Sequence, residues 1–258
     1  MSYLNQSIKN VYISSKQRQV GESSNSITVR FNPSIDRCKG VQIITAEIPQ
    51  TWYPFTYFNN QIAYVIDDGT NTIYYASLPT DKFYFNMTDL ATDIKTALDN
   101  AVDSDNNTNS SITFSVSFTM SKMSFLYGLE TGSESFQFVP TQNSAYSMVG
   151  LSNFAEGFIF SYQGTSIASL QRTLAVYILS DIVPPNGFST IPGCERTLAK
   201  IPVDVDAGNI ITYEDQSNSF TPLDSSYISQ MKLTLVDDNG TIIDLNGSDW
   251  SCELSYFY

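Results

Sequence analysis

Carboxylates are the side chains of this sequence best suited to chemistry, since it has 26 aspartate and glutamate residues and no histidine. Two carboxylates about 5 to 9 Å apart are enough for glycoside hydrolysis. The sequence nominates no such pair, because 26 acidic residues place some pair at any spacing by chance. The missing imidazole excludes Ser-His-Asp and Cys-His catalysis and every histidine-ligated metal site. We therefore expect no enzymatic activity and no catalytic residue.

Acidic loops could instead supply oxygen ligands to a cation. Asp103, Asp105 and Asn107 alternate as in the first half of a calcium-binding loop. Thr108 replaces the turn glycine of such a loop, and Phe114 replaces its final glutamate. The sequences IDDGTN and VDDNGT could also donate oxygens in a lectin-like sandwich, but Asp-Gly and Asn-Gly are first of all turn residues. We expect no metal and no other cofactor.

The cysteines and the charge limit the partners of the chain. Cys38, Cys194 and Cys252 are an odd number at wide spacing, which fits neither a disulfide framework nor a zinc site. The net charge is −13 and no basic run occurs, so a phosphate backbone would be repelled. No stretch approaches the roughly 18 apolar residues of a membrane span, and the N-terminus lacks a signal-peptide pattern. We expect no nucleic-acid partner, no membrane span and synthesis in the cytoplasm.

The elements that must position these residues are mostly strands. Ile27, Val29 and Phe31 alternate with polar residues, as in a strand with one buried face. The Asn239-Gly240 pair predicts a tight type I′ hairpin into a strand at 241–245. Apolar runs at 41–48 and 62–66 also predict strands, and the run at 174–179 predicts a strand buried on both faces. Further strands are expected at 72–76, 112–118, 123–127, 135–139, 199–205, 231–235 and 250–256. The connections are loops, which indicates an antiparallel β-sandwich.

One segment has helical periodicity. In TDLATDIKTALDNAV the apolar residues recur every three or four positions, and Thr88 could serve as the N-cap. These apolar residues are Leu90, Ile94, Ala97, Leu98 and Ala101. The sequence thus predicts an N-terminal arm at 1–26, in which NVYIS could form an edge strand, and a β-domain at 27–258 with an internal α/β elaboration at about 86–165.

Aromatic residues are concentrated in two short segments. TWYPFTYFNN contains Trp52, Tyr53, Phe55, Tyr57 and Phe58, and the sequence closes with SYFY. Large aromatic side chains fill cores, and they also contribute much of the contact area at protein interfaces. We expect about half of them in the core and the remainder on an assembly surface.

The order of motifs along the chain carries a family resemblance. The opening VYISSKQR is followed by ITVRFNP, by EIPQTWYPFTYFNNQIAYVI and by FYFNMTDLATDIKTAL. TFSVS, SAYSMVGL and MKLTLVDDNGTIIDLNGSDWSCELSYF come next. In this order the sequence resembles the penton and minor capsid proteins, with a single jelly roll, of virophages, polinton-like viruses and related large DNA viruses.

The resemblance implies an all-β fold, namely a jelly-roll β-sandwich with an inserted or decorating α/β element that contains one helix. Two small jelly rolls are the alternative fold. The implied function is a structural capsid protein, the penton subunit that forms homopentamers at icosahedral vertices and contacts capsomers of the major capsid protein. The protein would be made in the host cytoplasm and located in the virion capsid. Alternatives are a receptor- or glycan-binding, lectin-like spike and a compact major or minor capsid subunit.

Overall fold

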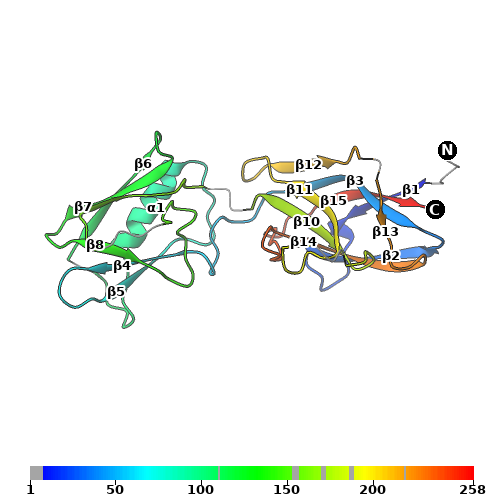
Figure 1. The fold of residues 1–258 in the computed structure, drawn as a ribbon. Coiled ribbons are helices and arrows are strands. Elements are labelled where there is room, and N and C mark those ends of the chain that lie inside the picture. Colours follow the sequence, from blue (N-terminus) through cyan, green and yellow to red (C-terminus); the bar gives the residue numbers. More distant parts are fainter. Residues whose placement is uncertain (1–7, 110, 153–156, 170–172, 186–188, 218) are drawn as a thin grey trace. The chain divides into compact units, whose positions relative to one another are not determined.

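The computed structural model folds into two compact units, which are joined where the chain leaves and re-enters the first of them (Figure 1). One unit combines Met1–Trp52 with Thr173–Tyr258, and the other is Tyr53–Arg172. The residues that the structure describes are 8–109, 111–152, 157–169, 173–185, 189–217 and 219–258.

Eight described strands of the first unit form two antiparallel sheets. They are β1 (Ile8–Ser14), β2 (Ser26–Ile35), β3 (Gly40–Pro49), β10 (Ala175–Ser180), β11 (Thr197–Pro202), β12 (Ile210–Glu214), β14 (Ile228–Val236) and β15 (Ser251–Phe257). One sheet has the order β1-β15-β3-β12, and the other has the order β11-β10-β14-β2. A short strand, β13 (Thr221–Pro222), also pairs with β3.

The order of these strands is that of a jelly roll. When the eight strands are numbered along the chain, they read 1-8-3-6 in the first sheet and 2-7-4-5 in the second. This arrangement is two Greek keys folded into a two-sheet sandwich. The predicted jelly-roll β-sandwich is therefore confirmed, and we call this part the jelly-roll unit.

Apolar and polar side chains alternate along the strands, and this explains why the interior of the sandwich is apolar. In β14 the side chains of Met231, Leu233 and Leu235 are buried while Lys232 between them is exposed. In β15 Leu254 and Tyr256 also point into this core. Because each such strand buries only one of its faces against the other sheet, its apolar residues recur with a period of two.

The N-terminal region differs from the arm expected at 1–26. β1 pairs with β15 over its whole length, from Ile8 opposite Phe257 to Ser14 opposite Ser251. A short 3-10 helix, Ser15–Gln17, then leads toward β2. β1 is thus an edge strand of the jelly roll, as NVYIS allowed, while residues 1–7 of the expected arm lie outside the described residues.

The second unit, which we call the inserted unit, is placed on the connection between β3 and β10. It contains β4 (Gln61–Ile66), β5 (Ile73–Ser77), α1 (Met87–Asp99), β6 (Thr113–Thr119), β7 (Ser124–Thr131), β8 (Phe136–Val139) and β9 (Ser161–Gln163). Its sheets have the orders β5-β4-β8 and β6-β7-β9. The inserted unit is therefore an α/β element with one described helix. The alternative fold, two small jelly rolls, is wrong because this unit is not a second jelly roll.

The inserted unit begins earlier than the elaboration expected at about 86–165. It starts at Tyr53, because β4 and β5 pair with each other and β4 also pairs with β8. The apolar run of β4 and the short β5 resemble the strand patterns of the jelly-roll unit, so the sequence could not assign them to a separate unit.

The helix α1 forms where its periodicity predicts it. Leu90, Ile94 and Leu98 are buried on one face. The N-cap is Asn86, whose side chain accepts a hydrogen bond from the backbone of Asp89, so the expectation of Thr88 as N-cap is wrong. Asn and Thr both favour this position, and Asn86 occupies it because its backbone is the one in the extended conformation.

An aromatic core joins the sheets of the inserted unit. The ring of Tyr64 is edge-on to Phe114 at 4.9 Å between centroids, and Phe114 is edge-on to Phe136 at 5.1 Å. The Tyr64 hydroxyl donates to the carbonyl of Leu98 at 3.0 Å and accepts from Asn109 at 2.9 Å. Edge-to-face packing and a satisfied hydroxyl make this buried tyrosine compatible with an apolar core.

The turn at Asn239-Gly240 is not the type I′ hairpin that the sequence predicted. Gly240 has φ of 78°, but Asn239 lacks the positive φ that a type I′ turn requires. The carboxylate of Asp237 instead accepts hydrogen bonds from the backbone of Asn239 and Thr241. Ile242 then forms only an isolated bridge to Val236, so no strand extends over 241–245.

Among the described residues, α1 and every other helix are too short or too polar to cross a membrane.

Candidate functional site

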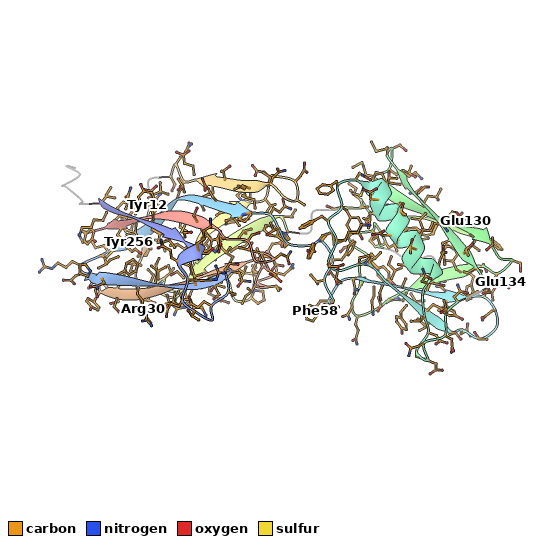
Figure 2. All side chains as sticks on the ribbon, turned by 180° about the vertical axis from the view of Figure 1, so that it is seen from behind. Tyr12, Arg30, Phe58, Glu130, Glu134 and Tyr256 are labelled. Atoms are coloured by element: carbon orange, nitrogen blue, oxygen red, sulfur yellow. The ribbon has the colours of Figure 1, made fainter. Side chains whose placement is uncertain are left out.

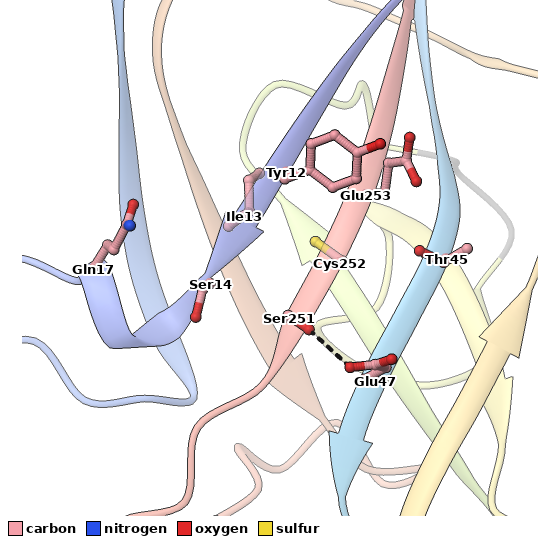
Figure 3. Close-up of a pocket in the computed structure, with 9 residues that line it drawn as sticks. All are labelled: Tyr12, Ile13, Ser14, Gln17, Thr45, Glu47, Ser251, Cys252 and Glu253. Carbon is pink, nitrogen blue, oxygen red and sulfur yellow. Dashed lines mark hydrogen bonds between the residues drawn. The ribbon is translucent and has the colours of Figure 1, made fainter.

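A shallow hollow lies on the outer face of the sheet β1-β15-β3-β12 (Figure 3). Its volume is about 390 Å³. Tyr12 of β1, Thr45 and Glu47 of β3, and Ser251 and Glu253 of β15 line it. These positions alternate with buried residues of the same strands, so the sandwich itself directs their side chains outward. We call this the sheet-face hollow.

The two carboxylates of the sheet-face hollow act as hydrogen-bond acceptors. The amide of Asn10 donates to Glu253 at 2.7 Å, and the Ser251 hydroxyl donates to Glu47 at 3.4 Å. A hydrogen bond to Glu253 and the negative charge of that residue raise the pKa of Tyr12. Tyr12 remains 78% exposed, so the hollow presents an aromatic ring beside the carboxylate of Glu253, with Glu47 farther along the sheet (Figure 3).

A second hollow of about 200 Å³ shares Ser14, Glu47 and Ser251 with the first. An ion pair at its border joins Arg18 to Asp249 at 2.6 Å. A hydrogen bond from the Ser15 hydroxyl and this ion pair lower the pKa of Asp249. The two hollows form one polar depression across the sheet, which is shaped for contact rather than for enclosing a substrate.

The carboxylates do not show the pKa pattern of a glycosidase. Such an enzyme needs a carboxylic acid whose pKa is raised so that it can donate a proton. Across the described ranges, every carboxyl group whose pKa departs clearly from its ordinary value has a lowered pKa. These groups are Glu22, Asp68, Asp103, Asp215 and Asp249. They stay ionised at neutral pH, which suits acceptors in turns and edges.

The loops considered for cations use their oxygens internally. The carboxylate of Asp103 accepts hydrogen bonds from the backbone of Asp105 and Asn107, each at 2.8 Å. Asp68 accepts from the backbone and the hydroxyl of Thr70. In the part of the chain with described positions, no three Cys, Asp or Glu side chains gather closely enough to hold a metal ion.

The aromatic segments divide between core and surface. Phe55 and Tyr256 are fully buried in separate units, whereas Tyr57 and Phe58 are 78% and 80% exposed. Tyr256 and Phe58 are labelled in Figure 2. Trp52 is partly buried against the core of the jelly-roll unit. The segment therefore contains both buried and exposed aromatic residues, and the expected assembly surface stays a prediction.

All three cysteines are buried, and burial raises the pKa of each thiol. For Cys252, whose side chain points into the sandwich, the pKa rises to about 12. Because the thiolate is the reactive form, buried thiols with raised pKa values react slowly.

We expect the native protein at pH 8 to react with an aromatic disulfide reagent at least about 100-fold more slowly than a free cysteine does. In denaturant all three thiols should react at the rate of the free amino acid. Absorbance of the released thiolate measures both rates. Rapid labelling of one thiol or more in the native protein would contradict the burial described here.

The residues of the sheet-face hollow were not identified from the sequence. Alternation predicts that Thr45, Glu47 and Glu253 point outward, but it does not say which strands lie side by side. Tyr12 fell within the expected arm. The sequence NVYIS predicts an edge strand. Once this strand is paired with β15, Tyr12 lies on the outward face of the sheet.

The comparisons with known proteins agree with this architecture. No protein-family model matches the sequence, and no curated protein matches it. Among solved structures, the chain is similar to the mavirus penton protein, with 12% sequence identity and a TM-score of 0.54 over 98% of this chain and 99% of that one. It also matches a chain of the Sputnik virophage structure at 11% identity and a TM-score of 0.42, over 98% and 97% of the two chains. The chain therefore has the fold of the mavirus penton protein over nearly its whole length, as the order of its motifs implied.

Proposed function

We propose that this chain is a structural capsid protein, and specifically a penton subunit that forms pentamers at the vertices of an icosahedral particle. The observation that carries the proposal is the jelly-roll fold, which agrees with that of the mavirus penton protein across 98% of this chain and 99% of the other. The role is mechanical rather than catalytic. Other copies of the chain and capsomers of the major capsid protein are the proposed partners, in the virion capsid after synthesis in the host cytoplasm.

A ring of identical subunits requires two different surfaces on each subunit, because each contact joins one surface to the other by rotation. The net charge of −13 opposes the approach of two copies at long range. Association must then come from apolar area and local charge pairs at the contact itself. Exposed apolar residues such as Tyr12, Ile210 and Tyr227 supply such area on the jelly-roll unit.

At raised protein concentration the purified chain should form a species with five times the subunit mass of 28.7 kDa. A stable contact of standard size buries about 1,600 Å², which is sufficient for association in the micromolar range or tighter. Native mass spectrometry measures the stoichiometry, and a map of the particle locates the subunit. Monomers at all concentrations, together with absence of the chain from the vertices, would defeat the pentamer proposal. Density elsewhere in the shell would favour another capsid role.

A receptor- or glycan-binding role is the second candidate, and the exposed pair Tyr57 and Phe58 favours it. Flat aromatic rings stack on sugars and anchor protein contacts. A glycan array at a concentration where the chain is monomeric separates the two candidates. Specific binding that is lost in the Tyr57→Ser, Phe58→Ser variant would support recognition, and absence of binding leaves the structural role.

A further inference from the structure

The jelly-roll unit has a cleft of about 440 Å³ where the edges of its two sheets meet. Lys9 and Val11 of β1 line one side, and residues 30–36 line the other. Tyr256 and Tyr258 form its floor, where Tyr256 is edge-on to Phe31 with 5.8 Å between ring centroids. β1 and β2 are the outermost strands of their sheets, so the cleft lies along an open side of the sandwich. We call this the edge cleft.

The rim of the edge cleft is basic. Lys9 and Arg30 are exposed, and within the described residues neither of them forms an ion pair. Arg30 is labelled in Figure 2. The Lys9 ammonium lies 5.2 Å from the centroid of the Tyr258 ring, a contact that holds the charge at the rim. Asp36, the acidic residue of the cleft, lies 3.9 Å from the guanidinium of Arg37.

This positive charge is local in a strongly acidic chain. Residues 8–39 contain two of the 26 acidic residues, Glu22 and Asp36. The same residues contain six of the 13 basic ones, namely Lys9, Lys16, Arg18, Arg30, Arg37 and Lys39. The region has an excess of four positive charges, whereas the whole chain has a net charge of −13.

The opposite side of the sandwich is acidic. β12 and β11 are the other outermost strands of the two sheets. Asp204 and Asp206 on their connection and Glu214 at the end of β12 are exposed. None of these three carboxylates forms an ion pair with another described residue. We call these three residues the acidic edge. Lys200 of β11, whose ammonium lies over the ring of Tyr177 at 5.8 Å from the centroid, offsets one of these charges, so residues 200–214 retain an excess of two negative charges.

We propose that the edge cleft of one copy receives the acidic edge of a second copy. Lys9 and Arg30 then pair with Asp204 and Asp206, and the exposed part of the Tyr258 ring is covered. This inference rests on the proposed ring, which needs two different and complementary surfaces on each subunit. Charge complementarity selects this pairing, because cleft against cleft and acidic edge against acidic edge both place like charges together.

Charge reversal tests the pairing. Lys9→Glu with Arg30→Glu makes both edges negative, and Asp204→Lys with Asp206→Lys makes both positive. Each double variant should weaken self-association by about 100-fold or more, since like charges then meet at the contact. The variant with all four substitutions restores opposite charges and should associate again. Lys122→Glu with Lys232→Glu, which changes net charge equally outside both edges, is the matched control and should associate nearly as the natural sequence does.

Mixing the two double variants supplies a second readout that does not depend on the fourfold variant folding. Their edges are complementary to each other, so the mixture should associate by strict alternation of the two chains. A ring of five cannot alternate, so mass spectrometry should show even-numbered or open assemblies. Hydrogen exchange of the core strands verifies that each variant is folded.

The outcomes distinguish this inference from the proposed function. If the natural sequence never associates and is absent from the vertices, the proposed pentamer itself is overturned, and the pairing of the two edges falls with it. If it forms pentamers and Lys9→Glu, Arg30→Glu associates equally well, only the pairing of edge cleft and acidic edge is overturned. Folded double variants that lose association and do not recover it on mixing also overturn the pairing.

Discussion

Replacing Trp250 with alanine should lower the free energy of unfolding of the jelly-roll unit by about 3–5 kcal/mol. The indole is 2% exposed, and it packs in the core between the two sheets. Its Nε1 donates a hydrogen bond of 2.6 Å to the carbonyl of Ser24. Truncation leaves a large cavity and removes the donor of a buried carbonyl. Urea unfolding followed by circular dichroism measures the loss.

Two variants separate packing from hydrogen bonding at this position. Trp250→Phe retains a ring but removes the donor, so we expect a smaller loss of about 1–3 kcal/mol. Val20→Ala changes a fully exposed side chain of the same unit and should alter stability by less than about 0.5 kcal/mol. If Trp250→Ala were as stable as Val20→Ala, the indole could not be the core residue described here.

Tyr64→Ala should destabilise the inserted unit by about 3–5 kcal/mol. Tyr64 is 0% exposed, and its loss removes the ring contact with Phe114 as well as the hydrogen bonds to Leu98 and Asn109. Each unit has its own hydrophobic core, so the loss should be local. Hydrogen exchange followed by mass spectrometry should show faster exchange within 53–172 and unchanged protection in β10, β14 and β15.

Tyr64→Phe provides the conservative comparison. It keeps the ring and leaves the Leu98 carbonyl and the Asn109 amide short of one partner, so a loss of about 1–3 kcal/mol is expected. Equal acceleration of exchange in both units for Tyr64→Ala would contradict the assignment of separate cores.

Most strands could be predicted because one of their faces is buried and the other is not. In β14 and β15 this gives alternation that is clear in the sequence. β12 was missed for the same physical reason: as an edge strand it buries only Ile211, and one buried residue sets no period. Pro202 lies at the end of β11, which is outermost in its sheet, and proline favours such edge strands because it cannot donate a hydrogen bond to a neighbouring strand.

The local residue pattern does not predict which distant strands pair with each other. Nothing in the residues of β1 specifies β15 as its neighbour, so a strand beginning at Ile8 was grouped with an arm. The sheet-face hollow and the edge cleft both depend on that pairing. The motif order suggested the jelly roll through resemblance, whereas hydrophobic periodicity alone gave a sandwich of unknown connectivity.

The position of β15 sets the order of events as the chain is synthesised. β15 lies between β1 and β3 in its sheet, so a nascent chain cannot close the sandwich until this last strand has left the ribosome. The inserted unit is contiguous and can acquire its core while later strands are still being translated. Before β15 is available, β1 and β3 have unpaired edges on the sides that β15 will occupy. Aberrant strand pairing is therefore most favoured during this stage of synthesis.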